Sequence, residues 1–204
     1  MVRPPLPNRK QSKVETCSCH VKPLQLPVYG NVYPDGSFLD GITVEIGRGG
    51  WAFAVMDEDG MVIAAAYGVP PPWIQGIEGA EAWALFQALL VTLPSLSRYW
   101  PDCLPVYLAT KKGPEVALDP RNVLARIHGM LLTALEDAPP DVVGWMLSHL
   151  TIKDLNLQMA TKSDESLVGR LDLEGNKLAD ELAKRGVEFH RVTPPDVTIL
   201  EGAP

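Results

Sequence analysis

The stretch GIEGAEAWALFQALLVTL, residues 76–93, carries an acidic residue where an apolar one is expected. The Pro70-Pro71-Pro72 run before this stretch and Pro94 after it bound a predicted helix. On that helix, the neighbours of Glu81 at spacings of three, four and seven residues are all apolar: Ile77, Ala84, Leu85 and Ala88. Glu81 is therefore expected to point into the protein.

A carboxylate that points into a core needs a positive partner. Burying it without one costs several kcal/mol, because the charge loses its hydration. A lysine or arginine in an ion pair would satisfy Glu81, and so would a metal ion. The helix alone leaves both alternatives open.

Two further acids have unusual surroundings. Asp35 stands in Tyr33-Pro34-Asp35-Gly36-Ser37, at the predicted exit of the first strand. Asp180 lies among the leucines and alanines of the last predicted helix. An exposed ion pair with Lys184, four residues later, would also explain Asp180.

The order of the predicted elements indicates the fold class. The Asp59-Gly60 turn joins two apolar runs into a hairpin. An apolar run that ends on Lys111 (VYLATKKGPEV, residues 106–116) is interpreted as the fourth strand. Strands are expected at 28–34, 50–57, 61–68, 106–110 and 142–149, and helices at 76–93, 120–136 and 173–185. This order predicts an α/β fold with a five-stranded mixed sheet and helices packed on it.

Composition limits the possible functions. The 204 residues include 18 basic and 25 acidic side chains, for a formal charge of −7. This sign argues against binding nucleic acid by broad neutralisation of phosphates, so any such contact must be local or metal-assisted. The longest apolar stretch is too short to span a bilayer, and no membrane association is expected.

The ends of the chain and the cysteines suggest one intracellular domain. Residues 1–26 are rich in proline and charge and are expected to form a disordered arm, with a tail at 193–204. The three cysteines form no disulfide framework, which favours a reducing compartment, cytoplasmic or nuclear, over secretion. Cys17-Ser18-Cys19-His20 lacks a second pair at zinc-ligand spacing, so no zinc site is predicted.

Several motifs, taken in order, resemble the ribonuclease H type 1 family, and the resemblance covers roughly residues 27–190. They are Asp35-Gly36-Ser37, Gly49-Gly50-Trp51, Ala80-Glu81-Ala82-Trp83-Ala84-Leu85, Trp145-Met146-Leu147-Ser148-His149 and Asn176-Lys177-Leu178-Ala179-Asp180-Glu181-Leu182-Ala183. The resemblance implies a ribonuclease H-like domain at 27–192. An insertion at about 150–172 and the run before the first helix are similar to retroelement-encoded relatives.

The resemblance also implies a function. It is hydrolysis of the RNA strand of an RNA–DNA hybrid with two Mg²⁺ ions. Asp35, Glu81 and Asp180 would hold the metal, and His149 would assist proton transfer or product release. Gly36, Ser37 and Asn176 would contact the substrate, and the protein is expected to be a monomer.

One position departs from the family pattern. The family has a further aspartate directly after the threonine that ends the fourth strand, and here Thr110 is followed by Lys111. Replacing an acid by a cation would weaken the binding of two divalent ions, leaving one or none bound.

Three interpretations remain open at this point. The protein is a hybrid nuclease weakened by Lys111, or a catalytically degenerate domain that binds nucleic acid or protein. Alternatively, it is a structural domain in which Lys111 neutralises Asp35 and Glu81.

Overall fold

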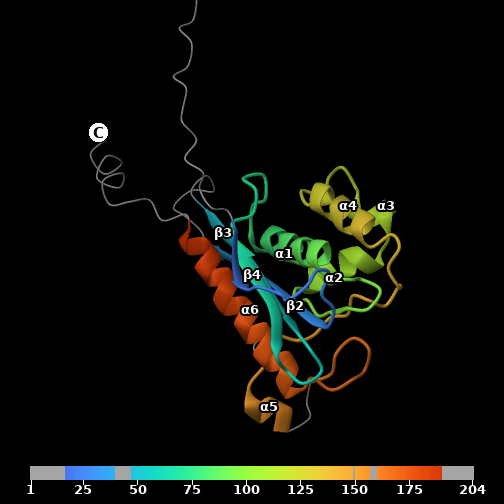
Figure 1. The fold of residues 1–204 in the computed structure, drawn as a ribbon. Helices are drawn as coiled ribbons and strands as arrows, with labels where there is room; N and C mark the ends of the chain where they lie inside the picture. Colours follow the sequence, from blue (N-terminus) through green and yellow to red (C-terminus); the bar gives the residue numbers. More distant parts are fainter. Residues whose placement is uncertain (1–16, 40–46, 149, 157–159, 190–204) are drawn as a thin grey trace, which may run out of the picture.

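The computed structural model describes residues 17–39, 47–148, 150–156 and 160–189 (Figure 1). The predicted C-terminal tail, residues 1–16 of the predicted arm and His149 lie outside these residues. Expectations about them, and the domain boundaries drawn from them, stay predictions.

Five strands form one sheet. They are β1 (Cys17–Val21), β2 (Asn31–Leu39), β3 (Arg48–Met56), β4 (Val62–Gly68) and β5 (Arg98–Tyr99). Their order in the sheet is β1-β4-β3-β2-β5. Every pairing is antiparallel except that of β2 with β5, which is parallel. The predicted five-stranded mixed sheet is therefore confirmed.

Two of these strands differ from the predicted ones. β1 lies inside the segment that was expected to be disordered, so the prediction is wrong for residues 17–21. Within the predicted domain, which begins after β1, the fourth strand along the chain is β5. It is not the run that ends on Lys111. That run is the helix α2 (Leu104–Lys111).

The helical state of α2 has a local cause. Pro105 occupies the first turn, where a missing N–H is harmless and the fixed φ suits a helix. Val106 and Ala109, three residues apart, are the buried positions of this segment, and that spacing places them on one helical face. The β-branched residues suggested a strand, but burial follows the helical period.

The predicted strand at 142–149 is reduced to a short contact among the described residues. Val143 forms an isolated parallel bridge with Tyr99. The backbone N–H of Tyr99 donates to Val142, and Gly144 donates back to Tyr99. The segment thus runs beside β5 without forming a full strand.

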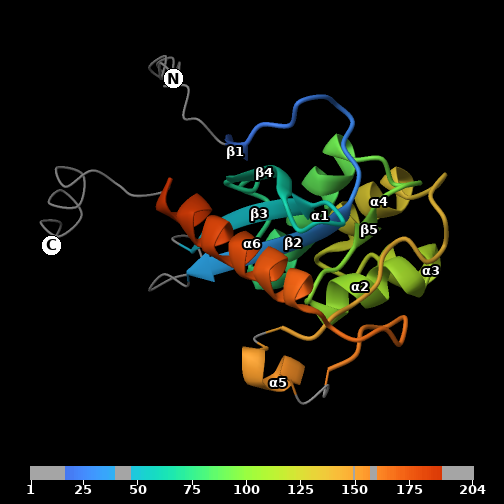
Figure 2. The ribbon, with the colours of Figure 1, turned by 60° about the horizontal axis from the view of Figure 1, so that its bottom comes forward.

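Two long helices cover the two faces of the sheet (Figures 1 and 2). α1 (Ile77–Val91) lies on one face and α6 (Arg170–Glu188) on the other. Both agree closely with the helices predicted at 76–93 and 173–185. The predicted hairpin is formed by β3 and β4, which pair antiparallel. In the turn between them Gly60 has a φ of 82°, a backbone conformation that favours glycine.

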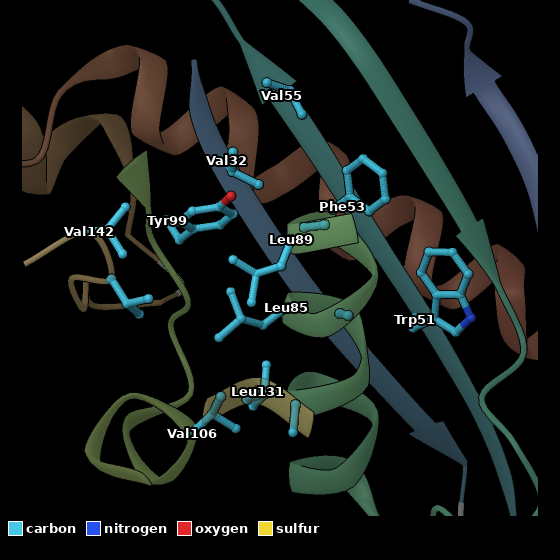
Figure 3. Packing of buried hydrophobic residues seen from close by; sticks show 14 of the residues in the cluster. Val32, Trp51, Phe53, Val55, Leu85, Leu89, Tyr99, Val106, Leu131 and Val142 are labelled. Atoms are coloured by element: carbon cyan, nitrogen blue, oxygen red, sulfur yellow. The ribbon is translucent and has the colours of Figure 1, made fainter. Parts of the chain in front are cut away.

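The two faces of the sheet are packed differently. On the α1 side, large side chains such as Val32, Phe53 and Val55 meet Leu85 and Leu89 of α1 (Figure 3). On the α6 side, Tyr33 and Met56 pack with Ala179 in the middle of the helix. Toward its end the strand residues are small, and the cluster there consists of Ala52, Ala54, Ala65, Leu182 and Ala183. Small side chains let α6 approach the strands closely, which brings its polar residues to the sheet.

The remaining helices are α3 (Pro114–Ala117), α4 (Ala125–Ala134) and α5 (Ile152–Asn156). α4 packs on α1 and adds Ile127 and Leu131 to the main core. It begins later than the helix predicted at 120–136, because the Asn122 side chain accepts the Leu124 N–H in a local turn. In the described part of the chain, no helix is both long and apolar enough to cross a membrane.

A buried ion pair fixes the first turn of α6. Asp172 accepts hydrogen bonds from the Gly169 backbone N–H at 2.8 Å and from the Tyr33 hydroxyl at 3.0 Å. Lys162 Nζ lies 3.2 Å from both Asp172 carboxylate oxygens and 4.3 Å from the centre of the Trp100 ring. The predicted insertion at 150–172 thus supplies a cation that joins α6 to the sheet.

Candidate active site

Asp35 comes from the middle of β2, not from its end as predicted, because the strand continues to Leu39. It pairs in register with Ala52 of β3 and is buried, with 6% of its surface exposed. Alternation along the strand places Tyr33 and Asp35 on the face that α6 covers and Gly36 on the opposite face. The structure therefore buries the Asp35 carboxylate beside the middle of α6, where Asp180 lies close enough to raise its pKa.

Glu81 is also buried, as its apolar neighbours predicted. α1 brings it to Asp35 because Gly36 has no side chain. A Cβ at Gly36 would collide with the Glu81 backbone nitrogen and lie 2.7 Å from the Ala80 carbonyl carbon. Gly36 thus has a packing role at the contact of strand and helix.

A third acid, Asp102, completes the cluster. Each of Asp35, Glu81 and Asp102 offers one carboxylate oxygen, and the three oxygens lie within 4.8 Å of one another. Asp102 lies three residues after the end of β5, and Trp100 and Pro101 separate it from the strand. Sequence reasoning missed it because the fourth strand was assigned to residues 106–110. In the sequence, the aromatic pair Tyr99-Trp100, followed by Pro101 and an acid, was the available signal for a strand end.

Two neighbours hold Asp102 in place. Asn176 of α6 donates from Nδ2 to Asp102 Oδ2 at 3.2 Å. Trp145 donates from its ring nitrogen to the Asp102 backbone carbonyl at 2.8 Å. The Oδ1 atom of Asn176 is buried and accepts no hydrogen bond among the described residues. Asn176 is thus placed to orient the carboxylate of Asp102.

The surroundings make full ionisation of the cluster unfavourable. Burial raises the pKa of Glu81 well above its ordinary value, and Asp35 and Asp102 raise it further. Burial raises the pKa of Asp35 to about 8, and the nearby Asp102 contributes. Three acids this close together repel one another unless protons or a cation join them.

The cluster fits a divalent metal ion. Glu81 Oε2 is buried and has no hydrogen-bond partner within the described part of the chain. No described lysine or arginine forms an ion pair with Asp35 or Glu81. Hard carboxylate oxygens without zinc-type nitrogen or sulfur ligands suit Mg²⁺. Such sites serve metal-assisted chemistry at phosphates.

The cluster lies in a cleft of about 730 Å³. Its lining includes the predicted residues Gly36, Ser37, Asn176 and Asp180 together with the three acids, so the structure brings these residues together. Asp180 is not a member of the tight cluster and instead accepts a hydrogen bond from Lys184 Nζ at 2.6 Å. The ion pair that the sequence offered as an alternative for Asp180 is therefore present.

Lys111 does not occupy a ligand position. Its Nζ donates to the Pro140 carbonyl at 2.7 Å and lies 3.5 Å from Asp141 Oδ1. The predicted replacement of a ligand by Lys111 is wrong, because the residue belongs to α2 and the acid after the fourth strand is Asp102. The proposed ion pair of Lys111 with Asp35 and Glu81 is wrong for the same reason. His149 lies outside the described residues.

No protein-family model and no curated protein matches the sequence. Solved structures match in fold. The PFV RNase H domain gives a TM-score of 0.54 at 15% identity, covering 78% of this chain and 94% of that chain. LC9-RNase H1, a type 1 RNase H with the type 2 active-site motif, gives 0.53 at 12% identity, covering 83% of this chain and 77% of that chain.

A third match is a larger protein. The foamy viral protease-reverse transcriptase in complex with RNA/DNA hybrid gives a TM-score of 0.51 at 14% identity, covering 82% of this chain and 21% of that chain. The mixed sheet between helices, with a cluster of three acids from β2, α1 and the segment after β5, defines an α/β domain with a carboxylate site at the sheet. The protein has the ribonuclease H fold.

Proposed function

We propose that this protein is a divalent-metal-dependent endonuclease that hydrolyses the RNA strand of RNA–DNA hybrids. The observation that carries the proposal is the cluster of Asp35, Glu81 and Asp102 in the cleft, with a buried Glu81 oxygen that has no partner among the described residues. The ribonuclease H fold of the chain supports it. The foamy viral protease-reverse transcriptase, whose structure is similar over this domain, was solved in complex with an RNA/DNA hybrid, which also supports the proposal.

The chemistry would come from Mg²⁺, which activates water and stabilises the departing oxygen when it is bound. Asp35, Glu81 and Asp102 would hold it, and Asn176 would keep the Asp102 carboxylate oriented. Asp180 adds a fourth acid on the cleft wall. Four carboxylates at −1 each and the Lys184 ammonium at +1 give a formal site charge of −3. Lys111 is not part of this site, so the charge argument that rested on Lys111 no longer applies.

The cleft also offers groups for an RNA strand. The Ser37 hydroxyl and the Asn176 amide line it beside the carboxylates. Contacts to 2′-hydroxyl groups distinguish RNA from DNA, and both side chains can make them. The net charge of −7 restricts binding to such local contacts. We place the activity inside the cell, in a chain of retroelement type that acts as a monomer.

The test is cleavage of an end-labelled RNA–DNA hybrid by the full chain with Mg²⁺, with EDTA and with all-DNA duplex as controls. Asp102→Asn should reduce cleavage by more than about a hundredfold, because even outer partners of a metal are worth ten- to a hundredfold. Lys111→Ala is the matched control and should stay within about twofold, since Lys111 contacts Pro140 and Asp141.

Two outcomes would contradict the proposal. Equal cleavage by wild type and Asp102→Asn would separate the activity from the cluster. A wild-type chain that binds the hybrid and Mg²⁺ but cuts nothing would favour a binding domain without catalysis.

A further inference from the structure

Asp180 differs from the other acids of the cleft in having a cation of its own. Its Oδ2 lies 2.6 Å from Lys184 Nζ, one helical turn further along α6. Both side chains line the cleft, and their exposed fractions are 34% for Asp180 and 64% for Lys184. The tight cluster formed by Asp35, Glu81 and Asp102 does not include Asp180.

We propose that the Lys184 ammonium takes the place of a second divalent ion beside Asp180, so that the site binds one metal ion firmly and a second only weakly. This inference rests on the proposed function. Lys184 is a positioning residue here, since it acts by holding the Asp180 carboxylate and contributing positive charge.

The first argument is competition for one carboxylate. A metal ion that uses Asp180 must displace an ammonium that already donates a short, charge-assisted hydrogen bond. Glu81, in contrast, keeps an oxygen without a partner in the described part of the chain. The first ion therefore meets one carboxylate oxygen without a hydrogen-bond partner among the described residues, whereas the second meets a carboxylate held by an ammonium.

The second argument is electrostatic. The negative charge of Asp180 is one of the causes that raise the pKa of Asp35. The pKa of Lys184 is raised mainly by its hydrogen bond to Asp180 and by the charge of Asp180, and the charge of Asp35 adds a smaller effect. The three groups are thus close enough to influence one another. A fixed positive charge at that range repels a divalent cation and partly replaces its effect on the acids.

The chain offers a matched control on the same helix. Arg170 and Glu174 form an ion pair with the same four-residue spacing and a distance of 2.7 Å. Neither residue lines the cleft. Arg170→Ala removes an ion pair of α6 without changing the charge near Asp180.

The experiment is calorimetric titration of the full chain with Mg²⁺, supported by counting bound Mn²⁺ by electron paramagnetic resonance. Wild type should show one stronger and one weaker site. Lys184→Ala and Lys184→Gln should strengthen the weaker site by about 1.5- to fivefold, the range expected when a partly exposed ion pair is removed. Lys184→Arg should restore wild-type binding, and Arg170→Ala should leave both sites unchanged.

Other results overturn the inference in distinguishable ways. If Lys184→Ala leaves both metal affinities unchanged but raises KM for the hybrid, Lys184 is a substrate contact and the proposed function stands. Two equal sites in wild type would also refute the inference alone. A wild-type chain that binds no Mg²⁺ refutes the proposed function together with the inference.

Discussion

The ion pair between Lys162 and Asp172 gives the sharpest test of how α6 is held to the sheet. Their side chains are 12% and 8% exposed, and Asp172 also accepts hydrogen bonds from Tyr33 and Gly169. Lys162→Met keeps most of the length of the side chain and removes its charge. Breaking one half of a buried ion pair costs about 3–5 kcal/mol, because the remaining charge is left without a partner.

The magnitude expected here is about 2–4 kcal/mol, about 1 kcal/mol below that range, because two hydrogen bonds to Asp172 remain after the substitution. Urea unfolding in EDTA, followed by tryptophan fluorescence, measures it. The double variant Lys162→Met with Asp172→Asn should recover part of the loss, since no unpaired charge is left. Arg170→Ala removes the exposed pair with Glu174 and should cost less than about 0.5 kcal/mol.

A cost for Lys162→Met below about 1 kcal/mol would refute the reasoning. It would mean that Asp172 is satisfied without the cation, as an exposed carboxylate would be. A double variant no more stable than the single one would show that lost packing against Trp100, and not charge, explains the effect.

Three further predictions concern the carboxylate cluster. The pKa of Asp35 is raised from its ordinary 3.8 to about 8, so the stability of the wild type falls as the pH rises between these values. In EDTA, Asp35→Asn should raise the free energy of unfolding by about 1–3 kcal/mol at pH 7 and by little at pH 4, and urea unfolding measures both values. Gly36→Ala places a Cβ against the Glu81 backbone and should destabilise the fold by more than about 2 kcal/mol, measured by thermal unfolding. Asn176→Ala removes the donor to Asp102 and should weaken Mg²⁺ binding by about tenfold in a calorimetric titration, while an unchanged affinity would contradict its orienting role.

Local signals in the sequence were sufficient for much of the fold and for two of the three clustered acids. Glu81 was identified because an acid on an otherwise apolar helical face has few structural explanations. The hairpin of β3 and β4 followed from its turn residues, and α6 from its helical period. Each of these features is decided within about twenty residues of chain.

Asp102 escaped prediction because its strand depends on tertiary pairing. β5 has only two residues, Arg98 and Tyr99, and is held by hydrogen bonds to β2 and to the segment around Val143. Such a short strand has no detectable period in the sequence. The apolar run after it looked more like a strand, and Lys111 was then placed where the acid belongs. β1 is also short, and its five residues are exposed or half-buried, so it too showed no apolar pattern in the sequence.

The pairing of β1 with β4 has a consequence for where the chain can be shortened. β1 is the outer strand on that side of the described sheet, and it covers Ala65, Ala66, Tyr67 and Gly68 of β4. A chain that begins at Leu26 loses this cover and presents the backbone of an uncharged strand, VIAAAYG, to other molecules. Unprotected edges of this kind recruit strands from neighbouring chains and lead to aggregation. Removing these five residues, which lie outside the expected domain, should therefore make the protein associate with itself more readily.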